Sequence, residues 1–401
     1  MAVVNISPKP FDDEVLDAVK RGIDQIGGLQ AFVKPGAKVL VKPNMCSMSL
    51  AITTDRRVIW SVAKVLKDYG CDVTIGENPV VDCSSKELFS KPEVLRIAEK
   101  AGVKVLNLRA DEHVKVKISN PRLFDELTVS KTALTSDLIV GVPTMRRHNL
   151  SGATLSIKNM YGTVSTTQRN IIHRKSLYWG LAEINKVLRP GLIVMDGINA
   201  SGNGTLYPLG LIIVGDDPVA VDTIASMRMG WEPGELEHIR CAHELGVGEM
   251  NPEKIELLGA SIDDIRKAGK ELRGKLSRFW KDPSEIVSKA KNVELIMGNP
   301  CTGCLNTLSM ALNEIGHEKL SGAPDMAVLI GPKAEPVEGK LNLIIGGCLG
   351  RFKDRGIFVD FCPAYGADIK GALEQALGLR DSFEYVWDKI LREREKDLPG
   401  V

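Results

Sequence analysis

Residues 38–76 read KVLVKPNMCSMSLAITTDRRVIWSVAKVLKDYGCDVTIG and set the pattern of the chain. Lys38–Val41 and Asp72–Gly76 are short, apolar segments that end at or near Gly, Pro or Asn, as buried strands do. Asp55–Tyr69, between them, has the longer apolar period of a helix. A strand, a helix and a second strand in this order are typical of an α/β protein.

The same alternation continues on both sides of this stretch and predicts an α/β fold with mostly parallel sheets flanked by helices. Further strands are expected at Val103–Leu106, Asp137–Val142, Leu192–Met195, Leu211–Val214, Lys254–Leu258, Met326–Ile330, Leu341–Ile345 and Ile357–Val359. Further helices are expected at Asp13–Phe32, Glu93–Ala101, Ser176–Val187, Pro218–Met229, Glu235–Leu245, Leu305–Ile315, Ile369–Leu377 and about Asp381–Glu395.

Composition excludes several function classes. The 401 residues include 52 Lys and Arg against 51 Asp and Glu, so a nucleic-acid or anionic-membrane binder is not expected. No apolar run approaches the roughly 20 residues that cross a bilayer. The N-terminal residues lack the zones of a secretory signal, so a cytoplasmic location is expected. Eight cysteines then indicate metal, cluster or reactive thiols rather than disulfides.

Four cysteines in the last quarter of the chain each follow a segment that is expected to be a strand. They are Cys301 and Cys304, in the sequence Cys-Thr-Gly-Cys, then Cys348, and Cys362 directly before a proline. The carboxyl ends of parallel strands lie along one edge of a sheet, so these four thiolates are expected to meet around one metal centre.

One Cys-x-x-Cys pair with two single cysteines suits either a [4Fe–4S] cluster or tetrahedral zinc, and the single pair favours the cluster. Gly303, Gly346 and Gly347 permit the close backbone approach that a bulky cluster needs. The alternative is that the four are ordinary core cysteines. Core positions are favoured for the other four, of which Cys46 is also a candidate reactive thiol: Cys46, Cys71, Cys83 and Cys241.

The cysteine-bearing segment resembles the proximal-cluster domain of nickel–iron hydrogenase small subunits and the related Complex I cluster subunit. The resemblance rests on Gly298-Asn299-Pro300-Cys301-Thr302-Gly303-Cys304, Ile345-Gly346-Gly347-Cys348 and Phe361-Cys362-Pro363, and covers about residues 290–380. It implies that the four cysteines bind a [4Fe–4S] cluster, and it implies no hydrogenase activity. The chain differs at Phe361, where Gly is usual, and lacks the further clusters of a hydrogenase small subunit.

A domain boundary is expected in the charge-rich stretch Arg266–Ser288, which contains Gly and Pro. Residues 1–270 are expected to form the main ligand-binding α/β domain, with a basic cleft, and residues 271–290 a linker. Residues 291–401 are expected to form a smaller, flavodoxin-like iron–sulfur domain.

A basic stretch lies between Gly141 and Pro190, where eight Lys or Arg stand against one acid, Glu183, for a local charge of +7. Such an excess indicates an anionic small molecule or an acidic redox partner protein, although a solvated surface is the alternative for each single residue. The eight are Arg146, Arg147, Lys158, Arg169, Arg174, Lys175, Lys186 and Arg189, and His148 and His173 lie among them.

Polar residues that follow the predicted strands mark a ligand site, because open sheets bind ligands at strand ends. The ligand-binding candidates are Lys42, Asn44, Arg146, Lys158, Asn159, Asp196, Gly202 and Gly204, and the catalytic candidates are His148 and Lys158. A tight turn is the alternative for Gly202 and Gly204, and the glycine spacing matches no nucleotide-binding motif.

Asp217 and Pro218 predict a helix start, with Asp217 as the cap and Pro218 at the first helical position. Asp222, about one turn further on, is expected either to reach the ligand pocket or to pair with a residue of the basic stretch. The sequence does not choose between these two roles.

The order of several motifs resembles the uncharacterised family called domain of unknown function 362, over about residues 36–265. The motifs are Val39-Leu40-Val41-Lys42-Pro43-Asn44, Thr53-Thr54-Asp55, His148-Asn149, Thr154-Leu155-Ser156-Ile157-Lys158-Asn159, Asp196-Gly197 and Asp216-Asp217-Pro218-Val219-Ala220-Val221-Asp222. Members of this family are often linked to iron–sulfur modules, commonly ferredoxin-like ones. The resemblance implies a fold and a map of the ligand site, but no reaction.

The leading functional hypothesis is an iron–sulfur oxidoreductase or electron-transfer protein that acts on an anionic ligand or an acidic partner at the basic cleft. One alternative is a non-redox cluster enzyme, a lyase or a sulfur-transfer enzyme, which requires an open iron site or a labile sulfide. Another is a maturation or binding protein whose cluster or zinc is structural. The sequence leaves homo-oligomerisation open.

Overall fold

The computed structural model describes residues 1–45, 53–79, 92–202, 204–276, 282–386 and 388–389. The chain divides into two compact units, each composed of three stretches. Unit 1 comprises Met1–His148, Ala153–Arg169 and Tyr178–Ser277, and unit 2 comprises Asn149–Gly152, Asn170–Leu177 and Arg278–Val401. Cys46, Cys83 and residues 387 and 390–395 of the helix expected at about Asp381–Glu395 lie outside the described residues.

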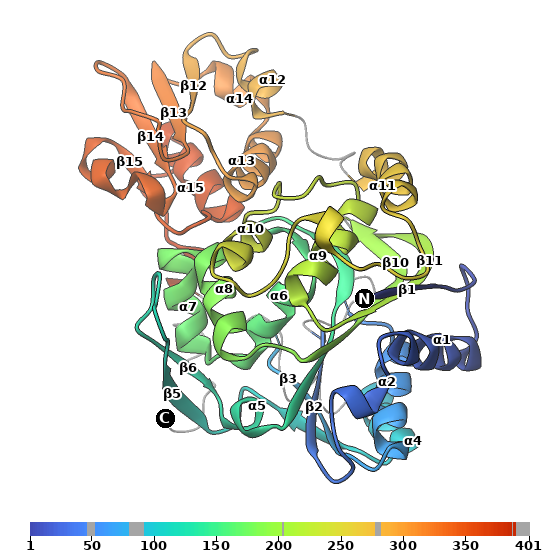
Figure 1. Ribbon diagram of the computed structural model, residues 1–401. Helices are drawn as coiled ribbons and strands as arrows, with labels where there is room; N and C mark the ends of the chain where they lie inside the picture. The colour runs from blue at the N-terminus through green and yellow to red at the C-terminus, as the bar shows by residue number, and fades with distance from the viewer. Residues whose placement is uncertain (46–52, 80–91, 203, 277–281, 387, 390–401) are drawn as a thin grey trace. The chain divides into compact units, whose positions relative to one another are not determined.

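Unit 1 is built on a nine-stranded sheet whose main path runs in the order β1-β11-β10-β7-β2-β3-β4 (Figure 1). The strands of this path are β1 (Ala2–Asn5), β2 (Lys38–Pro43), β3 (Asp72–Glu77), β4 (Lys104–Asn107), β7 (Leu138–Val142), β10 (Leu192–Gly202) and β11 (Thr205–Gly215). β2, β3, β4, β7 and β10 pair in parallel, whereas β11 is antiparallel to both β10 and β1.

The helices of unit 1 cover the sheet because their apolar faces match its buried side chains. On one face, α1 (Asp12–Gln25), α2 (Arg56–Asp68) and α4 (Pro92–Ala101) share a continuous core with strands β2, β3, β7, β10 and β11. Elsewhere in unit 1, α6 (Ser156–Asn159) packs against β7, and α9 (Pro218–Arg228) packs against β11.

The remaining elements before residue 282 complete the description. Short strands are β5 (His113–Lys117) and β6 (Glu126–Ser130), which form a separate antiparallel pair, and β8 (Thr144–His148) and β9 (Gly152–Thr154) beside β10. Helices are η1 (Leu29–Ala31), α5 (Lys131–Thr135), η3 (Met160–Thr163), α7 (Thr166–Lys175), α8 (Leu177–Val187), α10 (Glu237–Glu244), η4 (Pro252–Lys254) and α11 (Ile262–Leu276).

The predicted start of α9 is confirmed. The Asp217 side chain accepts hydrogen bonds from the backbone N–H groups of Val219 at 2.8 Å and Ala220 at 3.0 Å, and Pro218 is the first helical residue. Asp55 caps α2 in the same way, since its side chain accepts from the N–H of Arg57. Local sequence therefore sets where these two helices begin.

Unit 2 contains four parallel strands, β12 (Val293–Met297), β13 (Met326–Ile330), β14 (Leu341–Ile345) and β15 (Ile357–Val359). One hydrophobic core joins them to α12 (Pro283–Val287), α13 (Thr302–Ile315), α14 (His317–Ser321) and α15 (Gly366–Ala376). A second, smaller hydrophobic cluster contains Ala327 and Leu329 of β13, Ile344 of β14 and Leu349. The α/β class with mostly parallel sheets and flanking helices is thus confirmed.

Two expectations about the elements are wrong. The strands of unit 2 lie in chain order, β12-β13-β14-β15, whereas a flavodoxin-like sheet places its first strand between the second and third. Lys254–Leu258 does not form a strand. Within this segment, Leu258 forms an isolated β-bridge with Ala2.

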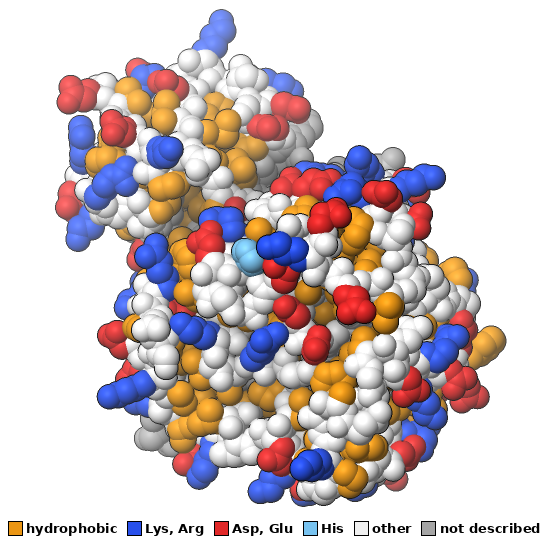
Figure 2. Space-filling view, viewed as in Figure 1, with side chains coloured by type: hydrophobic (Ala, Val, Ile, Leu, Met, Phe, Trp, Pro, Cys, Tyr) orange, Lys and Arg blue, Asp and Glu red, His pale blue; other side chains and the backbone are white. Residues whose placement is uncertain are grey.

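Charged side chains of both signs are interspersed over the face shown in Figure 2, in keeping with the balanced composition. Among the described residues, no helix is both long and apolar enough to span a bilayer.

Candidate functional site

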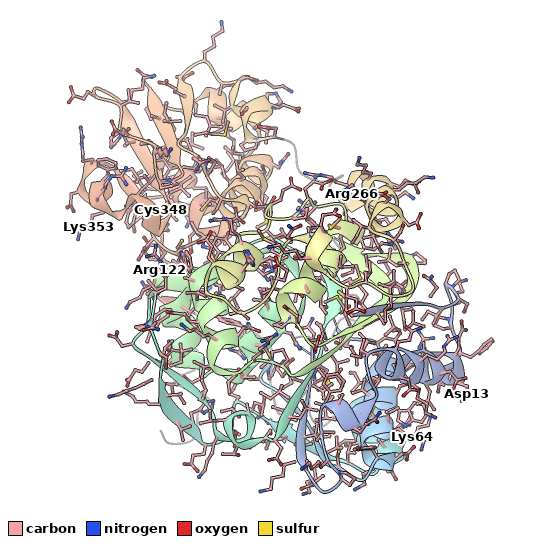
Figure 3. The ribbon with its side chains drawn as sticks, in the orientation of Figure 1. Asp13, Lys64, Arg122, Arg266, Cys348 and Lys353 are labelled. Atoms are coloured by element: carbon pink, nitrogen blue, oxygen red, sulfur yellow. The ribbon has the colours of Figure 1, made fainter. Side chains whose placement is uncertain are left out.

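The four predicted cluster cysteines lie at the carboxyl ends of three strands of unit 2. Cys301 is the N-cap of α13, after β12, and Cys304 lies in the first turn of that helix. Cys348 follows β14 in the helix η5 (Gly347–Arg355), and Cys362 lies three residues after β15. All four are thiols outside disulfides. Cys304 is buried, whereas Cys348 is exposed (Figure 3).

Two of the four sulfur atoms, those of Cys304 and Cys348, lie close to Gly346. A Cβ atom at this glycine would lie 3.5 Å from Cys304 Sγ and 3.6 Å from Cys348 Sγ, so these two sulfurs are within 7.1 Å of each other. A hydrogen bond with the Cys301 thiol raises the pKa of Cys304, and burial and the charges of Cys301 and Cys362 raise it further. The charges of Cys301 and Cys362 therefore act on Cys304.

Backbone N–H groups lower the pKa values of two of these thiols. A hydrogen bond from the backbone of Ala364 lowers the pKa of Cys304, against the effects that raise it. Burial, followed by the charge of Cys301, raises the pKa of Cys348, while the N–H groups of Cys348 itself and of Gly331 act in the opposite direction. Amides aimed at sulfur stabilise thiolates and cluster sulfides, so the donor set fits an iron–sulfur cluster.

Among the described residues, no three His, Cys, Asp or Glu side chains form a group that could hold one metal ion. Zinc holds four sulfurs at about 2.3 Å from one centre, whereas a [4Fe–4S] cluster distributes its four thiolates over four irons.

Phe361, the residue at which the chain departs from the hydrogenase pattern, keeps the backbone conformation of a glycine. Its φ is +79°, in the left-handed region. Its side chain is fully buried and packs edge-on against Tyr365 and Tyr385, each at 5.5 Å between ring centroids. The Arg174 guanidinium lies 4.7 Å from the centroid of the Phe361 ring. Aromatic packing thus stabilises Phe361 in a backbone conformation that residues other than glycine rarely adopt.

The segment Asn170–Leu177 belongs to unit 2 and holds the backbone of Cys362 on both sides. The N–H of Cys362 donates to His173 O, and the N–H of Leu177 donates to Cys362 O, both at 2.8 Å. Arg174 of the same segment pairs with Asp388 at 2.5 Å and with Asp360 at 3.8 Å. The segment therefore supports the cysteine cluster.

A second set of polar residues lies at the carboxyl ends of the central strands of unit 1. From β2, the chain continues to β3 and β4 on one side, whereas β7 and β10 lie on the other side. The switch point between β2 and β7 is where open parallel sheets bind ligands. Lys42, Asn44 and Asn159 are placed here: the backbone N–H of Asn44 donates to Thr54 Oγ1, which donates to Val142 O of β7.

Lys42 is 1% exposed, and its ammonium group is held by three acceptors. These are Glu77 Oε1 at 2.7 Å, Pro43 O at 2.8 Å and Asn159 Oδ1 at 3.2 Å. An ammonium group has three protons, so it can donate to all three of these acceptors, and the contacts join β2, β3 and α6. Gly162 packs directly over the pair, and a Cβ there would overlap the Glu77 carboxylate.

Asp196 of β10 is buried and tied to the start of α2. Its carboxylate accepts hydrogen bonds from the backbone N–H groups of Asp55 at 2.8 Å and Ile198 at 3.0 Å. Burial, and then the neighbouring charge of Asp55, raise the pKa of Asp196 to about 7. Arg57 forms an ion pair with Asp55 at 2.6 Å. Asp55 therefore links Asp196 of the sheet to Arg57 of α2.

Asp222 forms no ion pair with the basic stretch among the described residues. Its carboxylate accepts from the backbone N–H groups of Ser156 at 2.7 Å and Ile157 at 2.8 Å, and therefore caps α6 from α9. Burial raises the pKa of Asp222 to about 8. Lys158 of this helix lies 5.8 Å from the centroid of the Tyr161 ring.

Comparison with known proteins identifies the segment that carries this second set. Residues 39–227 match DUF362, a domain of unknown function. The DUF362 match confirms the family resemblance over these residues, which include Lys42, Asn159, Asp196 and Asp222. The cysteines of unit 2 lie outside the DUF362 segment.

Two further proteins are similar to this chain. Thylakoid-associated protein sll1697 of Synechocystis is 24% identical over 257 residues, which are 61% of this chain and 78% of that protein. The lactate racemase apoprotein from Thermoanaerobacterium thermosaccharolyticum has 13% identity, a TM-score of 0.37 and 53% coverage of each chain. The chain thus spans about half the length of that racemase.

The remaining candidates of the DUF362 segment lie at separate places. Arg146 and His148 are on β8, and Arg146 is paired with Ser201 of β10. Gly202 pairs with Thr205 at the end of the β10–β11 hairpin, and Gly204 has φ +79°, as a tight turn requires. The positions of these two glycines agree with the turn that was their alternative, and a ligand-binding role for them stays a prediction.

Several residues of the basic stretch are engaged by the fold itself. Arg169 donates to the carbonyls of Pro79 at 3.0 Å and Asn78 at 2.7 Å. Three others also donate to backbone carbonyls: Arg147 to Leu276, Lys186 to Asn120 and Arg189 to Asp216. Their charges hold loops and helix ends in place, which counting charges along a sequence does not show.

Sequence reasoning missed Glu77 and His238. Glu77 ends β3 as Lys42 nearly ends β2, and this shared position at adjacent strand ends is a signal that could have identified it. His238 of α10 is fully buried, and neither ring nitrogen has a partner among the described residues. Burial, with the positive charge of Lys158, lowers its pKa to about 3, so the ring is neutral.

Proposed function

We propose that this protein binds a [4Fe–4S] cluster through Cys301, Cys304, Cys348 and Cys362 and transfers single electrons to or from an anionic ligand or an acidic partner protein. The observation that carries the proposal is the approach of two thiols from different strand ends at Gly346, with the Cys304 and Cys348 sulfurs 3.5 Å and 3.6 Å from the position of its missing Cβ.

When bound, such a cluster supplies one electron at a time. The chain supplies the thiolates, the amides of Ala364 and Gly331 that stabilise negative charge on sulfur, and the buried ring of Phe361 beside them. Cys348 is exposed, so this ligand faces the surface at which a partner docks. Basic side chains follow it in η5, where Lys353 is labelled in Figure 3.

An anionic ligand remains a proposal for the strand ends of unit 1, with Arg146 and Lys158 as its cationic contacts and His148 or Lys158 as acid or base. Lys42, Asn159 and Asp196 would shape that site. We expect Lys158→Ala to weaken ligand binding and to leave cluster content unchanged. The cytoplasmic location also stays a prediction, since the Synechocystis relative is described as thylakoid-associated.

Anaerobic purification followed by iron, sulfide and zinc analysis tests the proposal. We expect about four irons and four sulfides per chain in the wild type. Cys304→Ser should lose most of both, whereas Cys71→Ala, a buried cysteine of unit 1, should retain them. About one zinc and no sulfide in the wild type would contradict the proposal and favour a structural metal.

Cys348 distinguishes electron transfer from a non-redox cluster enzyme. It is the most exposed of the four thiols, and a cluster without this ligand would have an open iron. Cys348→Ser should therefore lower cluster content markedly if all four cysteines are ligands. A variant that keeps the wild-type iron and sulfide content would favour the non-redox alternative.

A further inference from the structure

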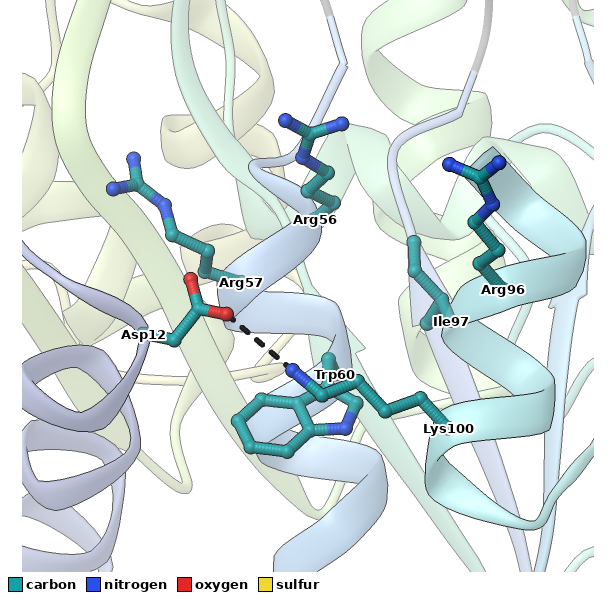
Figure 4. A pocket seen from close by; sticks show the side chains of 7 residues that line it. All are labelled: Asp12, Arg56, Arg57, Trp60, Arg96, Ile97 and Lys100. Carbon is teal, nitrogen blue, oxygen red and sulfur yellow. Dashed lines mark hydrogen bonds and ion pairs between the residues drawn. The ribbon is translucent and has the colours of Figure 1, made fainter. Parts of the chain in front are cut away.

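A pocket of about 270 Å³ lies on unit 1 among helices α1, α2 and α4 (Figure 4). None of its lining residues belongs to the cysteine cluster or to the strand-end set. Four of them are cationic, Arg56, Arg57, Arg96 and Lys100, and one is an acid, Asp12. The lining therefore carries a clear positive excess.

Two of these cations are already neutralised. Arg57 forms a two-pronged pair with Asp55, with Nη2 at 2.6 Å from Oδ2 and Nε at 2.9 Å from Oδ1. Lys100 pairs with Asp12 at 3.4 Å, and its ammonium lies 4.0 Å from the centroid of the Trp60 ring. These contacts fix Arg57 and Lys100 on opposite helices and shape the walls of the pocket.

Arg56 and Arg96 differ from them. Within the described part of the chain, neither guanidinium has a hydrogen bond or an ion pair. Figure 4 shows Arg56 extending from α2 and Arg96 from α4, on either side of the gap between the helices. Two unpaired guanidinium groups at one pocket repel each other, and a shared anion would remove that repulsion.

We propose that this pocket binds a small phosphorylated metabolite, with the phosphate held between Arg56 and Arg96. Guanidinium groups bind phosphate oxygens in pairs, and the positive excess of the lining suits a dianion better than a single carboxylate. Arg56 is also the first residue of a 13-residue helix, whose N-terminus adds positive potential.

The pocket also accommodates an organic part of the ligand. Trp60 is 9% exposed and Ile97 is half-buried, so together they give the pocket an apolar floor. The volume of about 270 Å³ lies just below the range of about 300–1,000 Å³ that is usual for drug-sized ligands. A phosphate ester of a small metabolite fits this size and this mixture of surfaces.

Calorimetry with pyrophosphate, at constant ionic strength, tests the proposal in the purified full-length protein. We expect wild-type protein to bind pyrophosphate, and the Arg56→Gln/Arg96→Gln double variant to bind it at least roughly tenfold more weakly. Lys64→Gln is the matched control, because Lys64 lies on the same helix and pairs with Asp68 (Figure 3). Its affinity should equal that of the wild type.

Equal binding by the double variant and the wild type would overturn the proposal, as would binding of acetate as strong as that of pyrophosphate. Sedimentation with vesicles of phosphatidylglycerol and phosphatidylcholine distinguishes the other source of phosphate groups. Arginine-dependent binding to the vesicles without binding of pyrophosphate would overturn the small-molecule assignment in favour of a membrane surface. Iron and sulfide content should be unchanged in every variant, so failure here leaves the cluster proposal intact.

Discussion

At the residue scale, Phe361 shows that a position can require the backbone of glycine without having its side chain. The left-handed conformation costs a residue with a Cβ about 1–2 kcal/mol. The buried ring, with Tyr365, Tyr385 and Arg174 around it, offsets this cost. Phe361 therefore combines a backbone conformation that favours glycine with a buried aromatic side chain.

The relative stabilities of two Phe361 variants test the proposed backbone preference at this position. Phe361→Ala should lose about 3–5 kcal/mol of unfolding free energy, because a large buried ring is removed. Phe361→Gly should be about 1 kcal/mol more stable than Phe361→Ala, since glycine accepts φ +79°. Urea unfolding, followed by tryptophan fluorescence and circular dichroism, measures both.

The matched control is Leu349, a fully buried residue whose φ is not positive. There, the Gly variant should be less stable than the Ala variant by about 0.5–1 kcal/mol. The same order at Phe361 and Leu349 would contradict the account of the Phe361 backbone.

Asp196 makes stability depend on pH. Its folded pKa of about 7 lies above the unfolded value near 3.8, so the folded state holds this proton more tightly. The stabilisation by the proton is complete below about pH 4 and is lost as the pH rises through 7, by an amount on the order of 4 kcal/mol. Asp222 gives the same sign of dependence, since its pKa is raised to about 8.

Asp196→Asn should remove the Asp196 part of this dependence. Urea unfolding from pH 4.5 to pH 8 should show a smaller loss of stability with rising pH in the variant than in the wild type. The slope due to Asp222 remains in both proteins. Parallel pH profiles for the two proteins would show that Asp196 is charged in the folded protein throughout this range.

At the scale of elements, α6 depends on a cap from another helix. Asp222→Ala removes the acceptor of two buried N–H groups, those of Ser156 and Ile157, and should cost about 2–4 kcal/mol of unfolding free energy. Asp222→Asn, which retains one acceptor oxygen, should be intermediate. Urea denaturation measures the three proteins.

Asp216→Ala is the matched control for Asp222→Ala. Asp216 lies just before α9, is exposed, and contributes only its backbone carbonyl to a contact with Arg189. Its loss should change stability by less than about 0.5 kcal/mol. A comparable loss of unfolding free energy from both substitutions would contradict the proposed role of Asp222 as the cap of α6.

The close packing of η3 over the strand ends gives another prediction. In Gly162→Ala, the new Cβ would lie 2.5 Å from Lys42 Cε and overlap the Glu77 carboxylate, so the buried ion pair must shift. We expect a loss of about 1–3 kcal/mol by chemical denaturation. Gly274→Ala in α11, where the Cβ meets open space, should be neutral or slightly stabilising. Equal changes in stability for Gly162→Ala and Gly274→Ala would mean that η3 can shift to accommodate the new methyl group.

Most of the strands that the sequence predicts are rich in Val, Ile or Leu, and several that it misses are rich in polar residues. β2, β3, β7, β13, β14 and β15 are found within two residues of their bounds, because runs of Val, Ile and Leu mark them. β5 and β8 read HVKVK and TMRRH, and their polar residues hide them. Residues 266–276 belong to α11, a helix that the sequence did not predict, because only a narrow stripe including Leu272 and Leu276 is buried among its charged residues.

At the scale of the whole molecule, the candidate sites differ in how far the sequence reveals them. The spacing of the cysteines and their positions after predicted strands are sufficient to predict that the four thiols lie close together. The support that Asn170–Leu177 gives to Cys362 is invisible to such reasoning, because it consists of backbone hydrogen bonds between distant segments. The domain boundaries at 270 and 290 stay a prediction, as do the roles of Arg146, His148 and Lys158.

Electron paramagnetic resonance of the anaerobically purified protein, before and after reduction with dithionite, tests the central claim most directly. The account predicts a signal that appears on one-electron reduction, integrates to about one spin per four irons, and is lost in Cys304→Ser but retained in Cys71→Ala. A protein that holds iron and sulfide yet accepts no electron, or one that holds only zinc, would contradict it.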